Sequence, residues 1–186
     1  MTFWKWVFDL MAAALTKENL ARAGAGTEAL GGAVTTQIAL GSGFDADAEE
    51  MARRNQIVSF ARLQIGKPYK YGAEVKPGQE GYAEAWDCSE CVEGSYRVAG
   101  LMIPDGVVNQ RAYCQRVSRP LPGDLICLDP NKKGIPHVLI CSGEGTVIHA
   151  LGGVGVVEQP LEQWTAHARF AGYYRHPDFN MRGERC

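Results

Sequence analysis

The chain has 186 residues, and 46% of them are hydrophobic, which is enough for one globular domain with a core and a short appendage. The formal net charge of −2 argues against a nucleic-acid-binding protein, and the apolar content excludes disorder along the whole chain. No run of about 18 apolar residues occurs, so we expect no transmembrane segment.

Residues 1–45 differ from the rest of the chain in composition. The start, MTFWKWVFDLMAAAL, is a poor secretory signal because Asp9 interrupts its apolar run, although a signal remains the alternative. The spacing instead predicts an amphipathic helix with one face formed by Phe3, Trp4, Val7, Phe8 and Met11. Residues 21–43 are rich in Gly and Ala and are expected to form a linker. We therefore predict an anchor or partner-binding segment over 1–45 and a compact domain over 46–186.

The compact domain is expected to begin with a helix. Asp47 and Glu50 form a pair like a capping box, and the helical period continues until Gly66 stops it. The buried face of this helix is predicted to contain Met51, Val58, Ala61 and Ile65.

A second helix is predicted over residues 87–100, after a loop over 74–85 that contains Pro and Gly. Asp87 is a suitable N-cap, and Gly100 provides the end. Cys88 therefore lies in the first turn of this helix.

Beyond residue 120 the pattern changes from helical to alternating, with Gly, Pro, Asn and Asp between short β-branched runs. Helices followed by strands indicate an α+β fold with an antiparallel meander. The strands are predicted within residues 121–129, 135–143, 145–153, 153–161 and 169–177, with a short helix or turn over 161–168.

One cysteine and two histidines form the candidate catalytic set. A helix N-terminus and a neighbouring imidazolium lower a thiol pKa, so Cys88 is expected to be an activated nucleophile. His137 and His149 are 12 residues apart on adjacent predicted strands and are symmetric about Gly143. They are therefore expected to lie opposite one another, or diagonally if the turn is centred later. One imidazole then takes the thiol proton and the other orients it.

The remaining cysteines and histidines have simpler interpretations. His167 and His176 are expected to be structural or surface residues, and Cys186 a terminal thiol. The cysteines expected to be small buried residues are Cys91, Cys114, Cys127 and Cys141. A zinc or redox site through Cys88 and Cys91 is a third-ranked alternative, because no second ligand pair completes it. We expect no metal and no cofactor.

Five motifs, in this order, resemble the NlpC-type cell-wall cysteine peptidases, which are papain-like: ARLQIGKPYKYG, WDCSECV, RPLPGDLICL, IPHVLICSGEGTVIHALGG and FAGYYRHP. The resemblance covers roughly residues 55–177. It implies a papain-like NlpC-type fold, with helices packed on five or six antiparallel strands.

The resemblance also implies roles for individual residues. Cys88 matches the nucleophile, His137 the general base and His149 the orienting residue. Tyr69 matches a tyrosine near the thiolate that helps to hold the substrate or the oxyanion. Asp87 and Ser89 match positions that contact the free amine and the peptide groups of the substrate.

Three features depart from the family pattern. Glu90 stands where the family usually has Gly, and its charge is expected to oppose thiolate formation at Cys88. Tyr71 stands where Trp is common, and the loop over 73–85 is longer than usual. This loop is expected to edge the cleft, so the choice of substrate can differ from that of relatives.

The resemblance implies hydrolysis of peptide bonds in peptidoglycan stem peptides, often between a D-γ-glutamyl residue and a diamino acid. Amidases of the same fold are an alternative, and so is a catalytically silent structural or adaptor protein of a tail assembly. Residues 1–50 hold 3 basic and 7 acidic side chains, a net charge of −4. A poor signal and this separate acidic segment favour delivery in a phage tail, as part of the virion, with residues 1–45 contacting an assembly protein. A secreted bacterial protein and an endolysin made in the cytoplasm are the alternatives.

Overall fold

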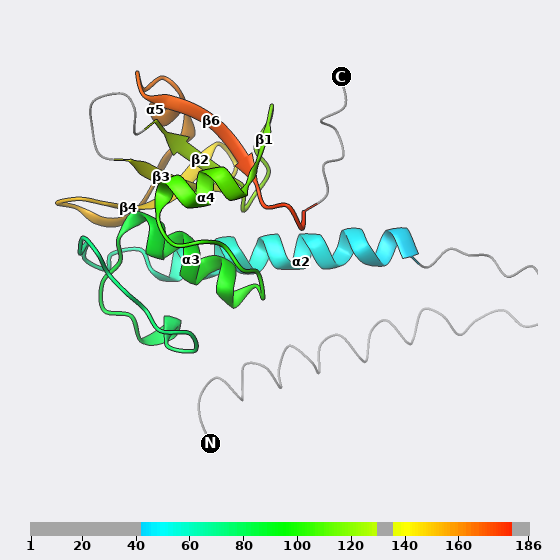
Figure 1. Ribbon diagram of the computed structural model, residues 1–186, viewed down its shortest axis with the longest axis horizontal. Coiled ribbons are helices and arrows are strands. Elements are labelled where there is room, and N and C mark those ends of the chain that lie inside the picture. Colours follow the sequence, from blue (N-terminus) through cyan, green and yellow to red (C-terminus); the bar gives the residue numbers. More distant parts are fainter. Residues whose placement is uncertain (1–41, 130–135, 180–186) are drawn as a thin grey trace, which may run out of the picture. The chain divides into compact units, whose positions relative to one another are not determined.

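The computed structural model describes residues 42–129 and 136–179 (Figure 1). The chain divides into two units, residues 1–39 and 40–186, and the described residues all belong to the second. The amphipathic helix and linker predicted over 1–45 therefore lie almost entirely outside the described residues, as does Cys186. Within the described ranges, no helix is both long enough and apolar enough to cross a membrane.

The described residues of this unit form four helices and a six-stranded sheet. The helices are α2 (Ser42–Leu63), α3 (Cys88–Val98), α4 (Val107–Tyr113) and α5 (Leu161–Thr165), with a 3-10 turn at Glu80–Tyr82. The strands are β1 (Gln115–Val117), β2 (Leu125–Leu128), β3 (His137–Gly143), β4 (Thr146–Leu151), β5 (Gly155–Pro160) and β6 (Phe170–Arg175). This is the predicted α+β class with an antiparallel sheet.

The strand order is β1-β6-β2-β3-β4-β5, and all neighbours are antiparallel. Strands β2 to β5 are the predicted meander. The last strand, β6, inserts between β1 and β2, and this crossover was not predicted. Strand β1 has only three residues, too few for an alternating pattern to reveal it.

The sheet has a helix-covered core on each face. Helices α2 and α3 pack on one face, below the sheet in Figure 1, against side chains that include Val138, Ile140 and Ile148. The other face packs against the segment around α5, through Leu139 and Trp164. Alternate residues of one strand thus enter different cores, as the period of two requires.

Helix α2 begins at Ser42, before the predicted start at Asp47. Its predicted face was wrong at both ends, because Met51 is 52% exposed and Ile65 is 45% exposed. The predicted Val58 and Ala61 are buried, and so are two polar side chains, those of Arg54 on α2 and of Gln64 in the turn that follows it. Both polar side chains have hydrogen-bond partners in the core. These partners offset the cost of burying a polar group, which hydropathy alone does not predict.

A buried ionic network joins α2 to the sheet. The carboxylate of Asp124 accepts hydrogen bonds from Arg54 Nη1 at 2.8 Å and from Arg175 Nη2 at 2.7 Å. It also accepts one from the backbone N–H of Leu121 at 2.9 Å. The three charged side chains are at most 1% exposed. This network ties together α2, the start of β2 and the end of β6.

Candidate functional site

Cys88 is the first residue of α3, and Asp87 caps the helix as predicted. Asp87 Oδ1 accepts hydrogen bonds from the backbone N–H of Glu90 at 2.8 Å and from the hydroxyl of Ser89 at 2.9 Å. Its other oxygen accepts the N–H of Gly72 at 3.1 Å. Asp87 therefore fixes both the first turn that carries the thiol and the segment that faces it.

Tyr69 is brought beside the thiol by a short parallel bridge to Trp86. The N–H of Lys70 donates to the carbonyl of Trp86 at 3.0 Å, and the N–H of Trp86 donates to the carbonyl of Pro68 at 3.1 Å. Burial and the charge of a Cys88 thiolate raise the pKa of Tyr69, so its phenol stays protonated as a hydrogen-bond donor.

The two predicted histidines meet. His137 Nε2 lies 2.8 Å from His149 Nδ1, and the two rings are nearly perpendicular. Ile140 pairs with Ile148, so the histidines are offset along the register rather than directly opposite. The symmetric pairing about Gly143 was therefore wrong, and the diagonal alternative is confirmed. Side chains on one face at this offset remain within reach of each other.

Gln159, on β5, sets the direction of the hydrogen bonds in this pair, although no motif in the sequence indicates it. Its Oε1 lies 2.9 Å from His149 Nε2. An amide oxygen only accepts, so His149 Nε2 carries the proton and His149 Nδ1 is an acceptor. His137 then donates from Nε2, and its Nδ1 keeps a lone pair suited to a general base. Gln159 follows the alternating pattern, but its partner could be found only once the β4–β5 register was known.

The thiol lies at the beginning of β3. The backbone N–H of Val138, the residue after His137, lies near enough to the sulfur of Cys88 to favour its thiolate form. Cys88 lines a pocket of about 360 Å³ and His137 lines another of about 580 Å³. Both pockets are also lined by Tyr69, so they are adjoining parts of one cleft.

Burial favours the uncharged forms of Cys88 and His137. It raises the pKa of Cys88 to about 11, against three backbone N–H groups that act in the opposite direction. It lowers the pKa of His137 to about 3, with further contributions from the charges of His149 and Arg169. The prediction of a lowered thiol pKa was therefore wrong in direction, because the sequence does not show that Cys88 is only 7% exposed.

Trp164 of α5 covers the histidine pair and was also missed. Its ring centroid lies 4.6 Å from that of His149 and 5.5 Å from that of His137. Its buried indole N–H has no hydrogen-bond partner among the described residues. Trp164 thus shields the hydrogen bond between the imidazoles from water, which strengthens it.

Glu90 holds the long loop against α3. Its Oε1 accepts the backbone N–H of Val75 at 3.0 Å. Arg97 donates to the carbonyl of Val75 and to Glu80 Oε1, both at 2.9 Å, so the loop is bound at several points. The largest charge effect on the thiol comes from Asp87. The predicted effect of Glu90 on Cys88 is therefore replaced by one from the helix cap.

Burial raises the pKa of Glu90 to about 7 from an ordinary 4.5. Ionising this carboxyl at higher pH weakens the folded state, so stability is lost as pH rises through 7. We expect Glu90→Gln to keep the bond from Val75 and to stabilise the protein at pH 8 by about 2–3 kcal/mol, with no gain at pH 4. Urea unfolding at pH 4 and at pH 8 measures this change in stability. Glu49→Gln, at an exposed position, is the control. An equal gain in stability at pH 4 and pH 8 would contradict a raised pKa at Glu90.

Several simpler expectations are confirmed. Cys91, Cys114, Cys127 and Cys141 are buried free thiols, and Cys88 is free as well. His176 is fully buried and bonds to the carbonyl of Met102 at 2.9 Å. His167 is exposed, as expected, but it stacks on Trp164 beside the site.

The chain is similar to several known proteins. A probable endopeptidase of Corynebacterium glutamicum strain R is 37% identical over 110 residues, which cover 58% of this chain and 47% of the relative. This chain thus spans less than half the length of the curated relatives it matches.

Solved structures share the fold. The peptidoglycan hydrolase RipB of Mycobacterium tuberculosis matches with a TM-score of 0.56 and 22% identity, over 74% of this chain and 72% of that one. The P60 domain of antigen MAP1204 from M. avium subspecies paratuberculosis matches with a TM-score of 0.57 and 19% identity, over 70% and 98%.

The family comparison gives the most specific result. The sequence model of the NlpC/P60 family matches residues 66–175, which contain Tyr69, Cys88 and both site histidines. This range is more than half of the chain and runs from the segment facing the thiol to the end of β6. The chain therefore belongs to the NlpC/P60 family.

Proposed function

We propose that this protein is a cysteine peptidase that hydrolyses peptide bonds in peptidoglycan stem peptides. The observation that carries the proposal is the hydrogen bond between His137 Nε2 and His149 Nδ1, which leaves a lone pair on His137 Nδ1 for a base. His137 directly precedes Val138, whose backbone N–H lies near the Cys88 sulfur. Family membership and the similarity to a probable endopeptidase support it.

The arrangement suits attack on a carbonyl carbon. The thiol proton moves to His137 as the sulfur attacks, because burial keeps both groups neutral beforehand. In this proposal, the backbone N–H of Cys88 and the hydroxyl of Tyr69 stabilise the oxyanion. The C–N bond then breaks, and His137 returns its proton to the leaving amine. Water hydrolyses the resulting thioester and regenerates the thiol.

The bond we propose joins a D-γ-glutamyl residue to a diamino acid. The pocket beside Cys88 is lined by the carboxylates of Glu74, Asp87 and Asp105, and no basic side chain of the described chain lines it. A free amine at the start of the stem peptide therefore has favourable electrostatic partners there. The acidic lining of this pocket therefore supports a substrate whose acyl half, the half that becomes bonded to the sulfur, has a free amino terminus.

The test is digestion of free stem peptides, whose first amine is unblocked, and of purified diaminopimelate-type peptidoglycan, in which that amine is joined to the sugar, with the fragments identified by mass spectrometry. We expect wild-type protein to release fragments that end at the D-γ-glutamyl carbonyl, and Cys88→Ala to release none. Fragments cut between the sugar and the peptide would favour the amidase alternative. No fragments from the free stem peptides or from several wall types would overturn the proposed activity and favour an adaptor.

Delivery within a phage tail remains a prediction, because it depends on residues 1–45. Immunoblots of purified virions with antibody to this protein test it directly. Recovery from the periplasm of a product that lacks residues 1–45 would contradict it and favour a secreted enzyme.

His149→Gln is expected to keep part of the activity, because a glutamine oxygen can still accept from His137 Nε2. His149→Ala removes the acceptor and should lower kcat by about a hundredfold or more, in the manner of an orienting group. Steady-state kinetics on a defined stem peptide measure both variants. Equal losses in the two variants would show that His149 does not orient His137 by this bond.

A further inference from the structure

The mechanism fixes which half of the substrate lies on which side of Cys88, and this inference rests on the proposed function. The leaving amine must receive its proton from His137, so it lies within hydrogen-bond reach of that imidazole. The leaving half of the substrate therefore occupies the pocket that His137 lines, and the acyl half occupies the pocket that Asp87 lines.

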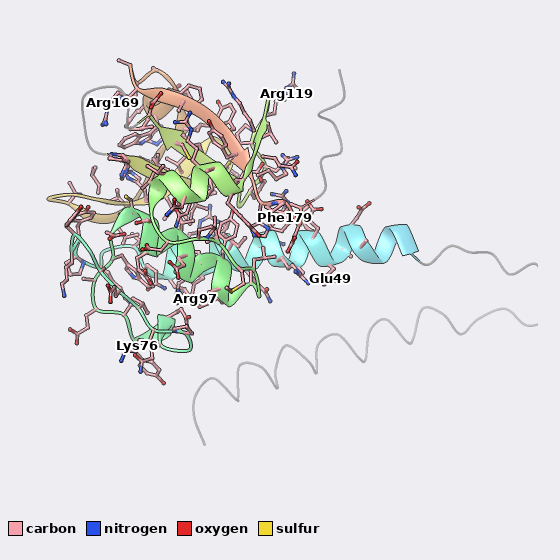
Figure 2. The ribbon with its side chains drawn as sticks, in the orientation of Figure 1. Glu49, Lys76, Arg97, Arg119, Arg169 and Phe179 are labelled. Carbon is pink, nitrogen blue, oxygen red and sulfur yellow. The ribbon has the colours of Figure 1, made fainter. Side chains whose placement is uncertain are left out.

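The pocket beside His137 has about 580 Å³, which is ample for an amino acid residue. Trp164, His167 and Arg169, from α5 and the segment after it, form one wall, and Tyr71 lies on another. Within the described chain, no carboxylate lines this pocket. Figure 2 shows Arg169 on the α5 side of the molecule, far from Arg97 and Lys76.

The polar groups of this pocket include several hydrogen-bond donors. His167 Nδ1 accepts the backbone N–H of Arg169 at 3.1 Å, so its Nε2 carries a proton. The indole N–H of Trp164 is buried without a described partner, a state that costs free energy until an acceptor arrives. The guanidinium of Arg169 adds a permanent positive charge.

The two pockets thus have opposite character. Carboxylates line the one beside Cys88, whereas the one beside His137 contains a guanidinium and N–H donors. A cleft with this polarity orients a peptide that has an amine at one end and an anionic group at the other.

We propose that the pocket beside His137 binds a carboxylate of the leaving amino acid, with Arg169 as its charged partner. Arg169 is near enough for its charge to disfavour the imidazolium of His137. A bound carboxylate offsets that charge, so the correct leaving group also assists the proton transfer. Arg169 is thereby a determinant of specificity, and its effect should reach kcat as well as KM.

The experiment compares three synthetic stem peptides with wild-type protein and Arg169→Gln. One is L-alanyl-γ-D-glutamyl-meso-diaminopimelate, one has the diaminopimelate side-chain carboxylate converted to an amide, and one has its main-chain carboxylate converted to an amide. The two amides distinguish the two sources of negative charge.

For wild-type protein, we expect one of the amides to lower kcat/KM by about ten- to a hundredfold, as for loss of a charged hydrogen bond. Arg169→Gln should lower kcat/KM on the acid peptide by a similar factor and leave that amide nearly unchanged. Arg169→Lys should restore part of the preference. Arg119→Gln, which removes an exposed guanidinium outside both pockets, is the matched control.

Equal wild-type rates on all three peptides would overturn this inference and leave the proposed activity standing. An equal loss on all three peptides in Arg169→Gln would also overturn it, because specificity would then be unaffected. Failure of wild-type protein to cut any peptide would overturn the proposed function and the inference with it. The wild-type comparison needs no variant, so poor folding of Arg169→Gln does not remove the test.

Discussion

Cys88→Ala is expected to abolish hydrolysis of stem peptides while leaving the protein folded. The substitution removes one sulfur atom from a residue that is 7% exposed, so we expect only a small change in stability. Loss of the nucleophile removes the acyl-enzyme route and should lower kcat by about a thousandfold or more. The measurement is the rate of peptide cleavage, with the thermal midpoint of unfolding measured in parallel.

Cys91→Ala is the matched control, because Cys91 lies in the same helix and is a free, buried thiol. It should retain nearly full activity. His137→Ala should cost nearly as much as Cys88→Ala, and the double variant little more, since nucleophile and base act as a unit. Full activity in Cys88→Ala would refute the mechanism.

Asp124→Ala is expected to have the largest effect on stability. The substitution leaves Arg54 and Arg175 as buried cations without their shared carboxylate. Breaking a buried ion pair in this way costs about 3–5 kcal/mol, which is a large part of the stability of a small domain. Urea unfolding followed by circular dichroism measures the loss, or shows that the variant does not fold.

The control for Asp124 is Glu49→Ala, which removes the carboxylate of an exposed pair with Arg53. Such pairs contribute less than about 1 kcal/mol, so we expect little change. Asp124→Asn keeps the volume and one acceptor oxygen, and it separates the loss of charge from the loss of packing. A loss for Asp124→Ala no greater than that for Glu49→Ala would show that the network does not hold α2 to the sheet.

The parts of the fold that were predicted are those with local signals. The cap at Asp87 and the helical period predicted the position of Cys88, and the alternating runs predicted the positions of β2 to β5. The spacing of the strands also predicted that His137 and His149 meet, and the observed register differs from direct pairing by one diagonal offset. These elements depend on neighbours in sequence, which a pattern can show.

The parts that were missed depend on contacts between distant segments. Arg54 is buried because it pairs with Asp124, which lies 70 residues further along the chain. No periodic pattern in the local sequence reveals that contact. Gln159 and Trp164 join the site only through the register of β5 and the packing of α5. The pKa of Cys88 depends on how deeply the assembled fold buries it. Each of these follows from tertiary packing rather than from local sequence.

The position of β6 between β1 and β2 has a consequence for the order of folding. During synthesis, β2 to β5 emerge first and leave β2 as an open edge, which invites pairing with other chains. Asp124 also lacks Arg175 until the end of β6 has been made. The domain is therefore expected to close late, in one step that joins residues far apart in sequence, and such topologies fold slowly. Arg169 directly precedes β6 and Trp164 lies on α5, the element before it, so the wall beside His137 is completed in that same late step.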